Sequence, residues 1–436
     1  MVFRAIRPSN IALIAAFSLA VISATAGVAS AQNEDLDADE QGLANEVSEG
    51  QADVVATDNQ ATGDAAGPSA DVSATAAAPE AKKKSKKLVF ETDDGKHKMA
   101  VKSRIQGRYE YTGKQDADDL SRFVLQRIRL GLAGHAFSKN INYAFQVDFA
   151  KGAETLKVYY LDLVLRKGIR LRVGQFKRPT SRQLLTSSSR QEFVDRAVPV
   201  GAFKGRIDIG LMVHNNYSKS PDFEWAVGVF NGNRADTGSI SVNTDDMGQV
   251  TGVSGESNLV DKFGPVVVAR VGINRNGLKG YSQADLEGGP LRFGVGAAVL
   301  ADFDIDDTDA DKDGAALVRG FLDFVVKVNG FSTTGALFLA TQQKEGETAF
   351  TEQEYADTGF HLQAGYMVTK QHQVVARYAQ VIADNEANDQ QEITAGYSFY
   401  PFKHSFKWQT DVGLKTKGDQ DLGDQVLVRS QLQLSF

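Results

Sequence analysis

A dense group of basic residues lies between Arg166 and Arg206. This stretch contains eleven Lys or Arg residues and only two acidic ones, Glu192 and Asp195. A guanidinium group is planar and donates hydrogen bonds in pairs that fit the oxygens of phosphate, and several such groups around a narrow aqueous path attract small anions. The residue types and the excess of positive charge therefore predict a site that binds or selects anions.

The candidate anion-binding residues include arginines that precede this stretch. We expect the site to be formed by Arg127, Arg129, Arg170, Arg172, Arg178, Arg182, Arg190, Arg196 and Arg206. The alternative for any single arginine is a structural ion pair, and the acidic candidates for such pairs are Asp148, Asp162, Asp208, Asp323 and Asp411. We expect no catalytic residue, no cofactor and no metal site, because the chain has no cysteine and its six histidines show no metal-binding spacing.

Short segments of alternating apolar and polar residues must position these arginines. In the last segment, from Gln425 to Phe436, apolar side chains occupy every second position except Ser430. This period of two is typical of a β-strand, and each segment is about as long as a tilted strand needs to cross a bilayer. We count sixteen such segments, at 99–111, 122–132, 141–149, 158–165, 169–176, 207–213, 223–229, 266–273, 291–299, 318–328, 331–339, 360–366, 374–380, 393–399, 406–414 and 425–436.

The pattern predicts an all-β fold, a transmembrane antiparallel β-barrel of sixteen strands preceded by a disordered tether. A barrel of this size encloses water. Apolar positions then face lipid and arginines face the lumen, because a basic side chain at mid-depth on the lipid side costs roughly 2–4 kcal/mol. Aromatic residues at strand ends, such as Tyr159, Tyr160 and Tyr400, are predicted to form interfacial girdles. A soluble sandwich or propeller also alternates, but it gives no reason for basic residues to stay opposite the apolar face.

The start of the chain has the pattern of a secretory leader. Arg4 and Arg7 precede an apolar stretch at 11–22, which is short for a membrane-spanning helix, and small residues precede Gln32. We expect residues 1–31 to be a signal peptide; an uncleaved anchor is the alternative. Together with the terminal Phe436, which is common at the end of outer-membrane barrels, the leader predicts the bacterial outer membrane.

Residues 32–87 differ in composition from the rest of the chain. They begin with a stretch, 32–81, that has twelve acidic residues and no Lys or Arg, and they end in a Lys-rich run at 82–87. Such a segment cannot bury enough apolar surface to offset its ordering entropy. It predicts a disordered, acidic, Ala-rich periplasmic tether before a barrel at 88–436. The Lys run is expected to be solvated; contact with anionic lipid or cell-wall polymer is the alternative.

One part of the barrel region resembles a known family. The motifs are Leu-Arg-Val-Gly-Gln-Phe-Lys-Arg-Pro at 171–179, Leu-Leu-Thr-Ser-Ser at 184–188, Phe-Val-Asp-Arg-Ala-Val-Pro at 193–199 and Gly-Arg at 205–206. They resemble the signature of the phosphate-selective porins O and P. The resemblance covers residues 123–436 and is most specific between Arg170 and His214. It implies a homotrimer of sixteen-stranded barrels with a long inward loop, and it places Thr186 to Arg206 in or beside that loop.

The predicted function is a passive outer-membrane porin for small anions. The resemblance implies phosphate or polyphosphate as the solute, with Arg190 and Arg196 as constriction residues. Outer-membrane lipid and lipopolysaccharide are expected to contact the barrel, and three copies of the chain are expected to form a homotrimer; no nucleic acid is expected. Residues 309–314 are expected to form an acidic extracellular loop, and cation bridging from this loop to lipopolysaccharide is the alternative.

Two other functions stay open. One is an envelope-tethering protein in which residues 32–87 are the main functional element. The other is an outer-membrane enzyme with Ser and His on the outer wall. For the enzyme, alternation places His361 inside the barrel with Gln363, and no Ser-His-acid arrangement is legible.

Overall fold

The computed structural model of the chain describes residues 88–115, 117–150, 153–203, 207–232, 239–244, 249–256, 263–303, 317–343, 353–418 and 423–436. The predicted leader at 1–31, the tether at 32–87, the acidic loop at 309–314 and the candidate residue Arg206 lie outside the described residues. Within the described part of the chain, no helix combines the length and the apolar character that crossing a membrane requires.

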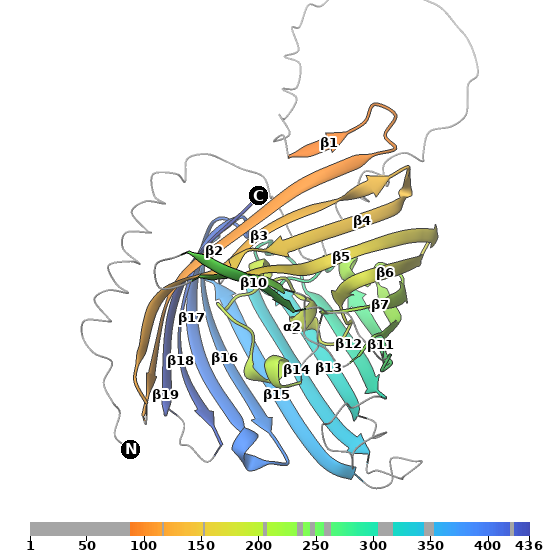
Figure 1. The fold of residues 1–436 in the computed structure, drawn as a ribbon. Helices are drawn as coiled ribbons and strands as arrows, with labels where there is room; N and C mark the ends of the chain where they lie inside the picture. The colour runs from red at the N-terminus through yellow and green to blue at the C-terminus, as the bar shows by residue number, and fades with distance from the viewer. Residues whose placement is uncertain are drawn as a thin grey trace, which may run out of the picture.

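An antiparallel sheet closes on itself to form a barrel (Figure 1). Nineteen strands belong to the sheet; β1, β9 and β10 are additions, and the other sixteen form the wall. Wall strands pair with their neighbours in chain order, β8 pairs with β11, and β19 pairs with β2. The wall strands are β2 (Lys98–Lys114), β3 (Leu120–Ala136), β4 (Ser138–Asp148), β5 (Ala153–Arg166), β6 (Ile169–Lys177), β7 (Ile207–His214), β8 (Phe223–Phe230), β11 (Val266–Arg275), β12 (Arg292–Asp302), β13 (Leu317–Val328), β14 (Phe331–Gln343), β15 (Gln353–Met367), β16 (His372–Ile382), β17 (Gln390–Phe402), β18 (Phe406–Lys417) and β19 (Gln425–Ser435).

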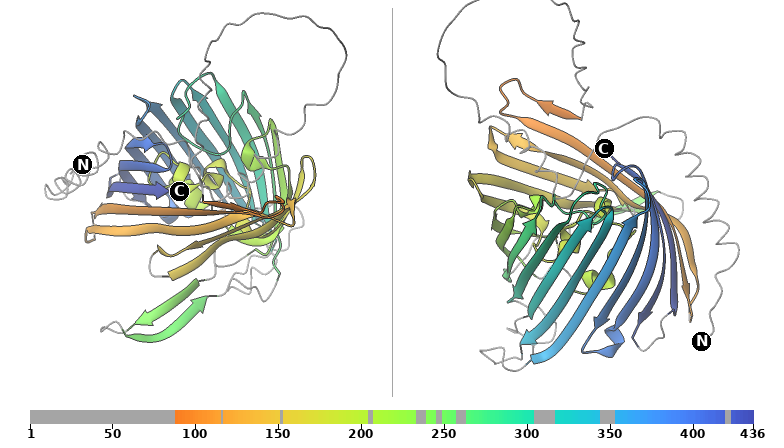
Figure 2. Two further views of the ribbon diagram at one scale, coloured as in Figure 1. Left: turned by 90° about the horizontal axis from the view of Figure 1, so that it is seen from above. Right: turned by 180° about the vertical axis from the view of Figure 1, so that it is seen from behind.

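Each of the sixteen predicted segments coincides with one wall strand, so the predicted fold is confirmed. The three added strands were not predicted. They are β1 (Val89–Glu91), which pairs with β2, and the hairpin of β9 (Ser239–Thr244) and β10 (Val250–Glu256), which pairs with β5 and projects from the ring of strands in Figure 2. The β1 strand is too short to show a period, and β9 and β10 have few apolar residues.

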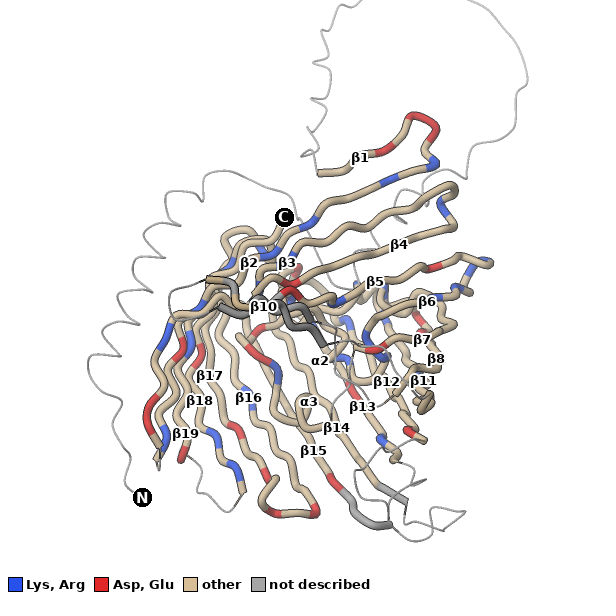
Figure 3. Tube along the Cα trace, in the orientation of Figure 1, with Lys and Arg blue, Asp and Glu red and all other residues tan. Residues whose placement is uncertain are grey.

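Side chains alternate across the wall as predicted. On β5, Leu161 is 52% exposed on the outside, whereas the next residue, Asp162, is fully buried inside. Basic and acidic segments lie side by side on neighbouring strands around β17–β19 (Figure 3). The girdle prediction is wrong for Tyr160 and Tyr400, which are buried: the Tyr160 ring lies 4.2 Å from the guanidinium carbon of Arg172, and the Tyr400 hydroxyl donates to Gln373. Adjacent residues of a strand face opposite sides, so Tyr159 and Tyr160 cannot both face lipid.

The interior of the barrel is partly packed. Apolar side chains of the wall, such as Phe176, Phe230 and Phe338, are buried in one cluster with Leu185 and Phe203 from the connection between β6 and β7. This differs from the uniformly water-filled lumen that the strand number suggested. The difference arises because a chain segment occupies part of the lumen and brings its own apolar side chains. Short 3-10 turns, η4 (Tyr217–Lys219) and η6 (Glu386–Asn388), complete the described elements.

Candidate anion-binding constriction

The connection between β6 and β7 folds into the barrel; we call its described part, residues 178–203, the inward loop. It contains α2 (Arg182–Leu185), η3 (Ser188–Arg190) and α3 (Val198–Ala202), which lie inside the ring of strands when the barrel is viewed from above (Figure 2). Serine side chains begin the first two turns by accepting hydrogen bonds from main-chain N–H groups, Ser181 from Leu184 and Ser187 from Ser189. The sequence therefore folds this segment locally into short turns that begin with a serine cap.

Carboxylates of the wall hold the main chain of the inward loop. Three loop N–H groups donate to them: Arg182 to Asp323 at 2.8 Å, Val194 to Asp411 at 3.1 Å and Val198 to Glu392 at 3.2 Å. Each of these carboxylates also pairs with a wall arginine, in the pairs Arg270–Asp323, Arg429–Asp411 and Arg377–Glu392. These wall arginines therefore hold the anchoring carboxylates in place. Their role is to position the loop.

The two acidic residues of the inward loop are also anchors. Asp195 accepts from Arg108 at 2.8 Å and from Arg429 at 2.9 Å. Burial alone would raise the pKa of Asp195, but the nearby Arg429 and Arg108 guanidinium groups hold that pKa well below its usual range. Asp195 is therefore an anion throughout the physiological pH range, and it ties the loop to the wall.

Glu192 is held by neutral groups. Its carboxylate accepts from Ser332 on β14, Gln363 on β15 and Gln373 on β16, each at 2.5 Å. Burial raises the pKa of Glu192, because these amide and hydroxyl donors compensate only part of the lost hydration. Both acids of the basic stretch are thus used to fix the loop.

A glycine in the wall makes room for α3. A Cβ atom at Gly359 of β15 would lie 2.6 Å from a ring carbon of Phe203 and 3.1 Å from the Cβ of Pro199. We expect Gly359→Val to displace the end of α3, because the added methyl groups occupy space that the loop now fills. Limited proteolysis of the detergent-purified barrel should show faster cleavage between β6 and β7. Gly320→Val is the control, because the nearest atom to its Cβ is 3.9 Å away; equal protection of both variants would contradict the expectation.

Four of the predicted site residues form buried ion pairs. Arg129 pairs with Asp148, Arg170 and Arg172 share Asp162, and Arg178 pairs with Asp208. All five acids that the structural alternative named pair with a lumen arginine. Arg172 is also covered by the rings of Tyr160 and Phe176. These four arginines stiffen the wall, and their charge is compensated locally.

Arg182 is buried but lies among neutral groups. Its guanidinium carbon lies 4.4 Å from the centre of the Tyr281 ring, and it donates to the carbonyl oxygen of Gly280 at 3.2 Å. Its side chain is 5% exposed, so it has little contact with a solvated path.

The remaining described candidates, Arg127, Arg190 and Arg196, are half-buried. Arg196 donates to the main-chain carbonyl oxygens of Gln183, Leu184 and Thr186 at 2.8–3.3 Å. Arg127 donates to the side-chain oxygen of Gln106 at 2.8 Å. For Arg127 and Arg196, the described residues place no carboxylate within ion-pair distance. These two guanidinium groups therefore combine positive charge with contact to solvent.

Positive charges gather around Arg196. Burial and the neighbouring guanidinium groups of Arg127, Arg129 and Arg104 lower the pKa of Arg196, and Asp195 opposes them. Arginine remains protonated at neutral pH despite such a shift. The cost of holding these cations together favours an anion between them.

Further basic residues of the wall contact the inward loop. Arg104 of β2 donates to the Ser188 hydroxyl at 2.9 Å, and Lys407 of β18 donates to the Gln191 carbonyl oxygen at 2.8 Å. The sequence analysis did not select them for the site, although alternation places both on the lumen face. Burial and nearby cations, led by Lys407 and Arg190, lower the pKa of His404 far below its usual value, so this turn residue is neutral. Within the described residues, no group of three or more His, Asp or Glu side chains is arranged to hold a metal ion.

Comparisons with known proteins agree with the barrel. A family model described as phosphate-selective porin O and P matches residues 99–436. An uncharacterized protein of Aquifex aeolicus (strain VF5) is 22% identical over 379 residues, which cover 78% of this chain and 87% of that protein.

Two solved structures resemble the fold. The outer membrane channel DcaP of Acinetobacter baumannii has a TM-score of 0.52 and 14% identity, over 80% of this chain and 99% of that one. The Salmonella typhi OmpF complex with daunomycin has a TM-score of 0.51 and 11% identity, over 80% of this chain and all of that one. At this identity the two structures indicate a shared barrel fold.

Proposed function

The chain belongs to the phosphate-selective porin O and P family and forms an outer-membrane channel, and we propose that it selects phosphate or polyphosphate at a constriction formed by Arg127, Arg190 and Arg196. The observation that carries this proposal is a difference in burial among the candidate arginines. Arg129, Arg170, Arg172 and Arg178 are buried in ion pairs of the wall, whereas Arg127 on β3 and Arg190 and Arg196 in the inward loop are half-buried. An ion that passes the loop meets guanidinium groups that still reach water.

The chemistry of these groups suits a phosphate ion. Each guanidinium offers two parallel N–H donors to two phosphate oxygens and replaces part of the hydration shell that the ion loses in a narrow passage. Hydrogen bonds from Arg196 to loop carbonyl oxygens fix its orientation without neutralising its charge. The low-dielectric surroundings of a narrow pore also strengthen the field of these fixed cations. A site of this kind attracts an anion strongly enough for entry and, with solvent present, weakly enough for release.

Three features of the working protein extend this proposal beyond the barrel. We propose that residues 1–31 are removed as a leader, that residues 32–87 form a periplasmic tether, and that three copies of the chain assemble. Electrophoresis of the detergent-purified protein tests the assembly. We expect a trimer that dissociates on heating, and a monomer with no larger species would contradict the assembly. The family and the fold are those of channel proteins.

Planar bilayer recordings test the selectivity directly. We expect the reversal potential of the wild-type channel in a KCl gradient to indicate anion preference, and we expect millimolar phosphate to reduce the chloride current by competing for the same guanidinium groups. Glucose at the same concentration is the control, because it adds no charge. Cation preference would contradict the constriction, and unaltered chloride current in phosphate would contradict the proposed solute.

A further inference from the structure

A second chain segment enters the barrel from the rim where β19 ends. It connects β11 to β12 at 276–291, and we call it the rim segment. Neighbouring strands alternate in direction, so the connections at 329–330, 368–371 and 403–405 lie at the same rim, and they are far shorter. Short turns face the periplasm in outer-membrane barrels. Within the rim segment, Leu278, Tyr281, Gln283 and Asp285 are buried, which a solvated turn would not require.

The tip of the rim segment binds the inward loop through Gln283. The main-chain N–H of Gln283 donates to the carbonyl oxygen of Arg190 at 3.1 Å, and its side-chain oxygen accepts from the N–H of Glu192 at 2.8 Å. The same oxygen accepts from Gln363 of β15 at 3.2 Å. Gln283 therefore joins the loop, the wall and the rim segment, and it fixes the main chain on both sides of Gln191.

Tyr281 makes the second contact. Its hydroxyl donates to Glu224 of β8 at 2.9 Å, and its ring lies 4.4 Å from the guanidinium carbon of Arg182 on the loop. Burial raises the pKa of Tyr281 far above its usual value, so the phenol stays neutral and keeps this proton. The ring thus fills the space between β8 and the start of α2 and accepts the positive charge of Arg182 on its face.

The rim segment is also tied to the wall on both sides of Gln283. Lys327 of β13 donates to the Ser282 hydroxyl at 2.7 Å and to the Ala284 carbonyl oxygen at 2.8 Å. Asp285 pairs with Arg292 at 2.6 Å and accepts from the N–H of Gly330 at 2.9 Å. These bonds from β12, β13 and the next turn make the segment a rigid insertion.

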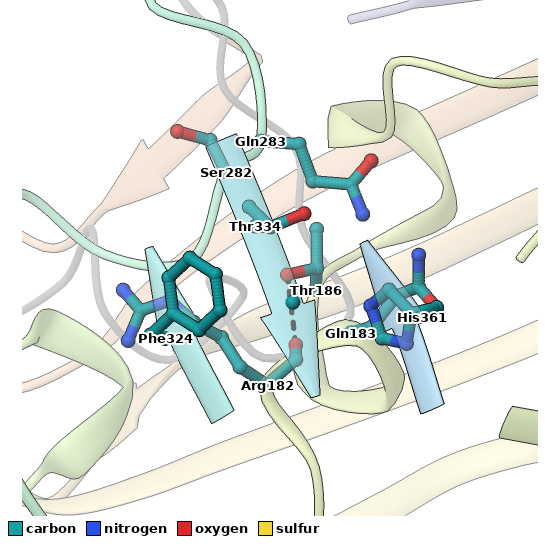
Figure 4. A pocket seen from close by; sticks show the side chains of 9 residues that line it. Arg182, Gln183, Thr186, Ser282, Gln283, Phe324, Thr334 and His361 are labelled. Carbon is teal, nitrogen blue, oxygen red and sulfur yellow. Dashed lines mark hydrogen bonds between the residues drawn. The ribbon is translucent and has the colours of Figure 1, made fainter. Parts of the chain in front are cut away.

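The space where the two insertions meet is nearly closed. A pocket there is lined by residues of α2, the rim segment and strands β13–β15, with Arg182, Gln183, Gln283, Thr334 and His361 around it (Figure 4). Its volume is about 10 Å³, which corresponds to the space of about one water molecule. A phosphate ion does not fit in this pocket.

We propose that the rim segment is a second constriction element, which closes the part of the lumen beside β8 and β11–β15 to solutes. The inference rests on the proposed function only in taking the lumen as the path of a solute. The size of the opening follows from the rim segment, and its ionic preference follows from the arginines.

Shortening the rim segment tests this assignment. We expect replacement of residues 278–288 by Ser-Gly to raise the single-channel conductance by about twofold or more and to admit larger neutral polyethylene glycols, because a packed part of the lumen opens to water. Anion preference should persist, because the variant retains all three arginines of the proposed constriction. Unchanged conductance and an unchanged polymer cut-off in a folded barrel would overturn the proposal.

A milder variant covers the case in which the shortened chain does not fold. The double variant Tyr281→Ala, Gln283→Ala removes the side-chain contacts to the loop and keeps the segment length; its conductance should rise and fluctuate more than that of the wild type. Gln371→Ala is the matched control, since Gln371 lies in another turn at this rim and donates to Pro401, not to the loop. Equal conductance for the double variant and the control also overturns the proposal. Cation selectivity of the wild type would contradict only the proposed function.

Discussion

Replacing Arg127, Arg190 and Arg196 together by glutamine is expected to lower the ratio of anion to cation permeability by roughly tenfold or more, because fixed charges in a narrow cleft concentrate counter-ions by factors of about 10–10³. Glutamine removes the charge and keeps an N–H donor and the stem of the side chain, and the wall carboxylates that bind the loop main chain are unaltered. Reversal potentials in a KCl gradient across planar bilayers measure the change. Competition by phosphate should weaken in the same variant.

The control for this experiment is a charge-neutral pair of substitutions. Arg178→Gln combined with Asp208→Asn removes a buried ion pair of the wall without altering the net charge of the lumen. We expect nearly wild-type selectivity, because the field of this pair is already cancelled. If the control loses as much anion preference as the triple variant, the distinction between buried and half-buried arginines fails.

Asp411→Ala is expected to destabilise the barrel strongly. The Asp411 carboxylate binds the Arg429 guanidinium at 2.7 and 3.0 Å and the N–H of Val194 at 3.1 Å, and it is almost fully buried. Removing one partner of a buried ion pair costs about 3–5 kcal/mol when the other is left uncompensated, and we expect a loss of about 3 kcal/mol because Arg429 keeps its bond to Asp195. Urea unfolding of the barrel in lipid vesicles measures the loss.

The same substitution should loosen the inward loop. Faster proteolysis between β6 and β7 and a noisier single-channel current are expected alongside the lower stability. Asp384→Ala, at an exposed position between β16 and β17, is the control and should leave both properties unaltered. Wild-type stability of Asp411→Ala would show that the wall carboxylates do not hold the loop.

The wall of the barrel could be predicted from the sequence because its cause is local. A strand with lipid on one side and the lumen on the other must alternate apolar and polar side chains. Leu161 and Asp162 are adjacent residues that show this alternation. The five acids proposed as partners for lumen arginines were also identifiable, since they occupy the same face. Only the pairing was undetermined: Arg178 meets Asp208 because β6 lies beside β7, which is a property of strand order.

The interior could be predicted only in part. The family motifs indicated the inward loop, but its anchors lie far away in sequence: Glu192 contacts β14, β15 and β16, and Asp195 contacts β2 and β19. No sequence pattern predicted that the rim segment inserts into the barrel. Its Asn276-Gly277 and Gly288-Gly289-Pro290 read as ordinary turn residues, and nothing local shows that the connection between them enters the barrel.

The single carboxylate of Asp195 has a consequence for assembly. The carboxylate accepts hydrogen bonds from Arg108 on the first wall strand and from Arg429 on the last, and these two strands pair directly with each other. The Asp195 side chain therefore links the first and last wall strands from inside the barrel. Both ion pairs can form only after these two strands have paired. The inward loop that narrows the pore therefore also holds β2 and β19 together, and these contacts of the loop depend on closure of the barrel.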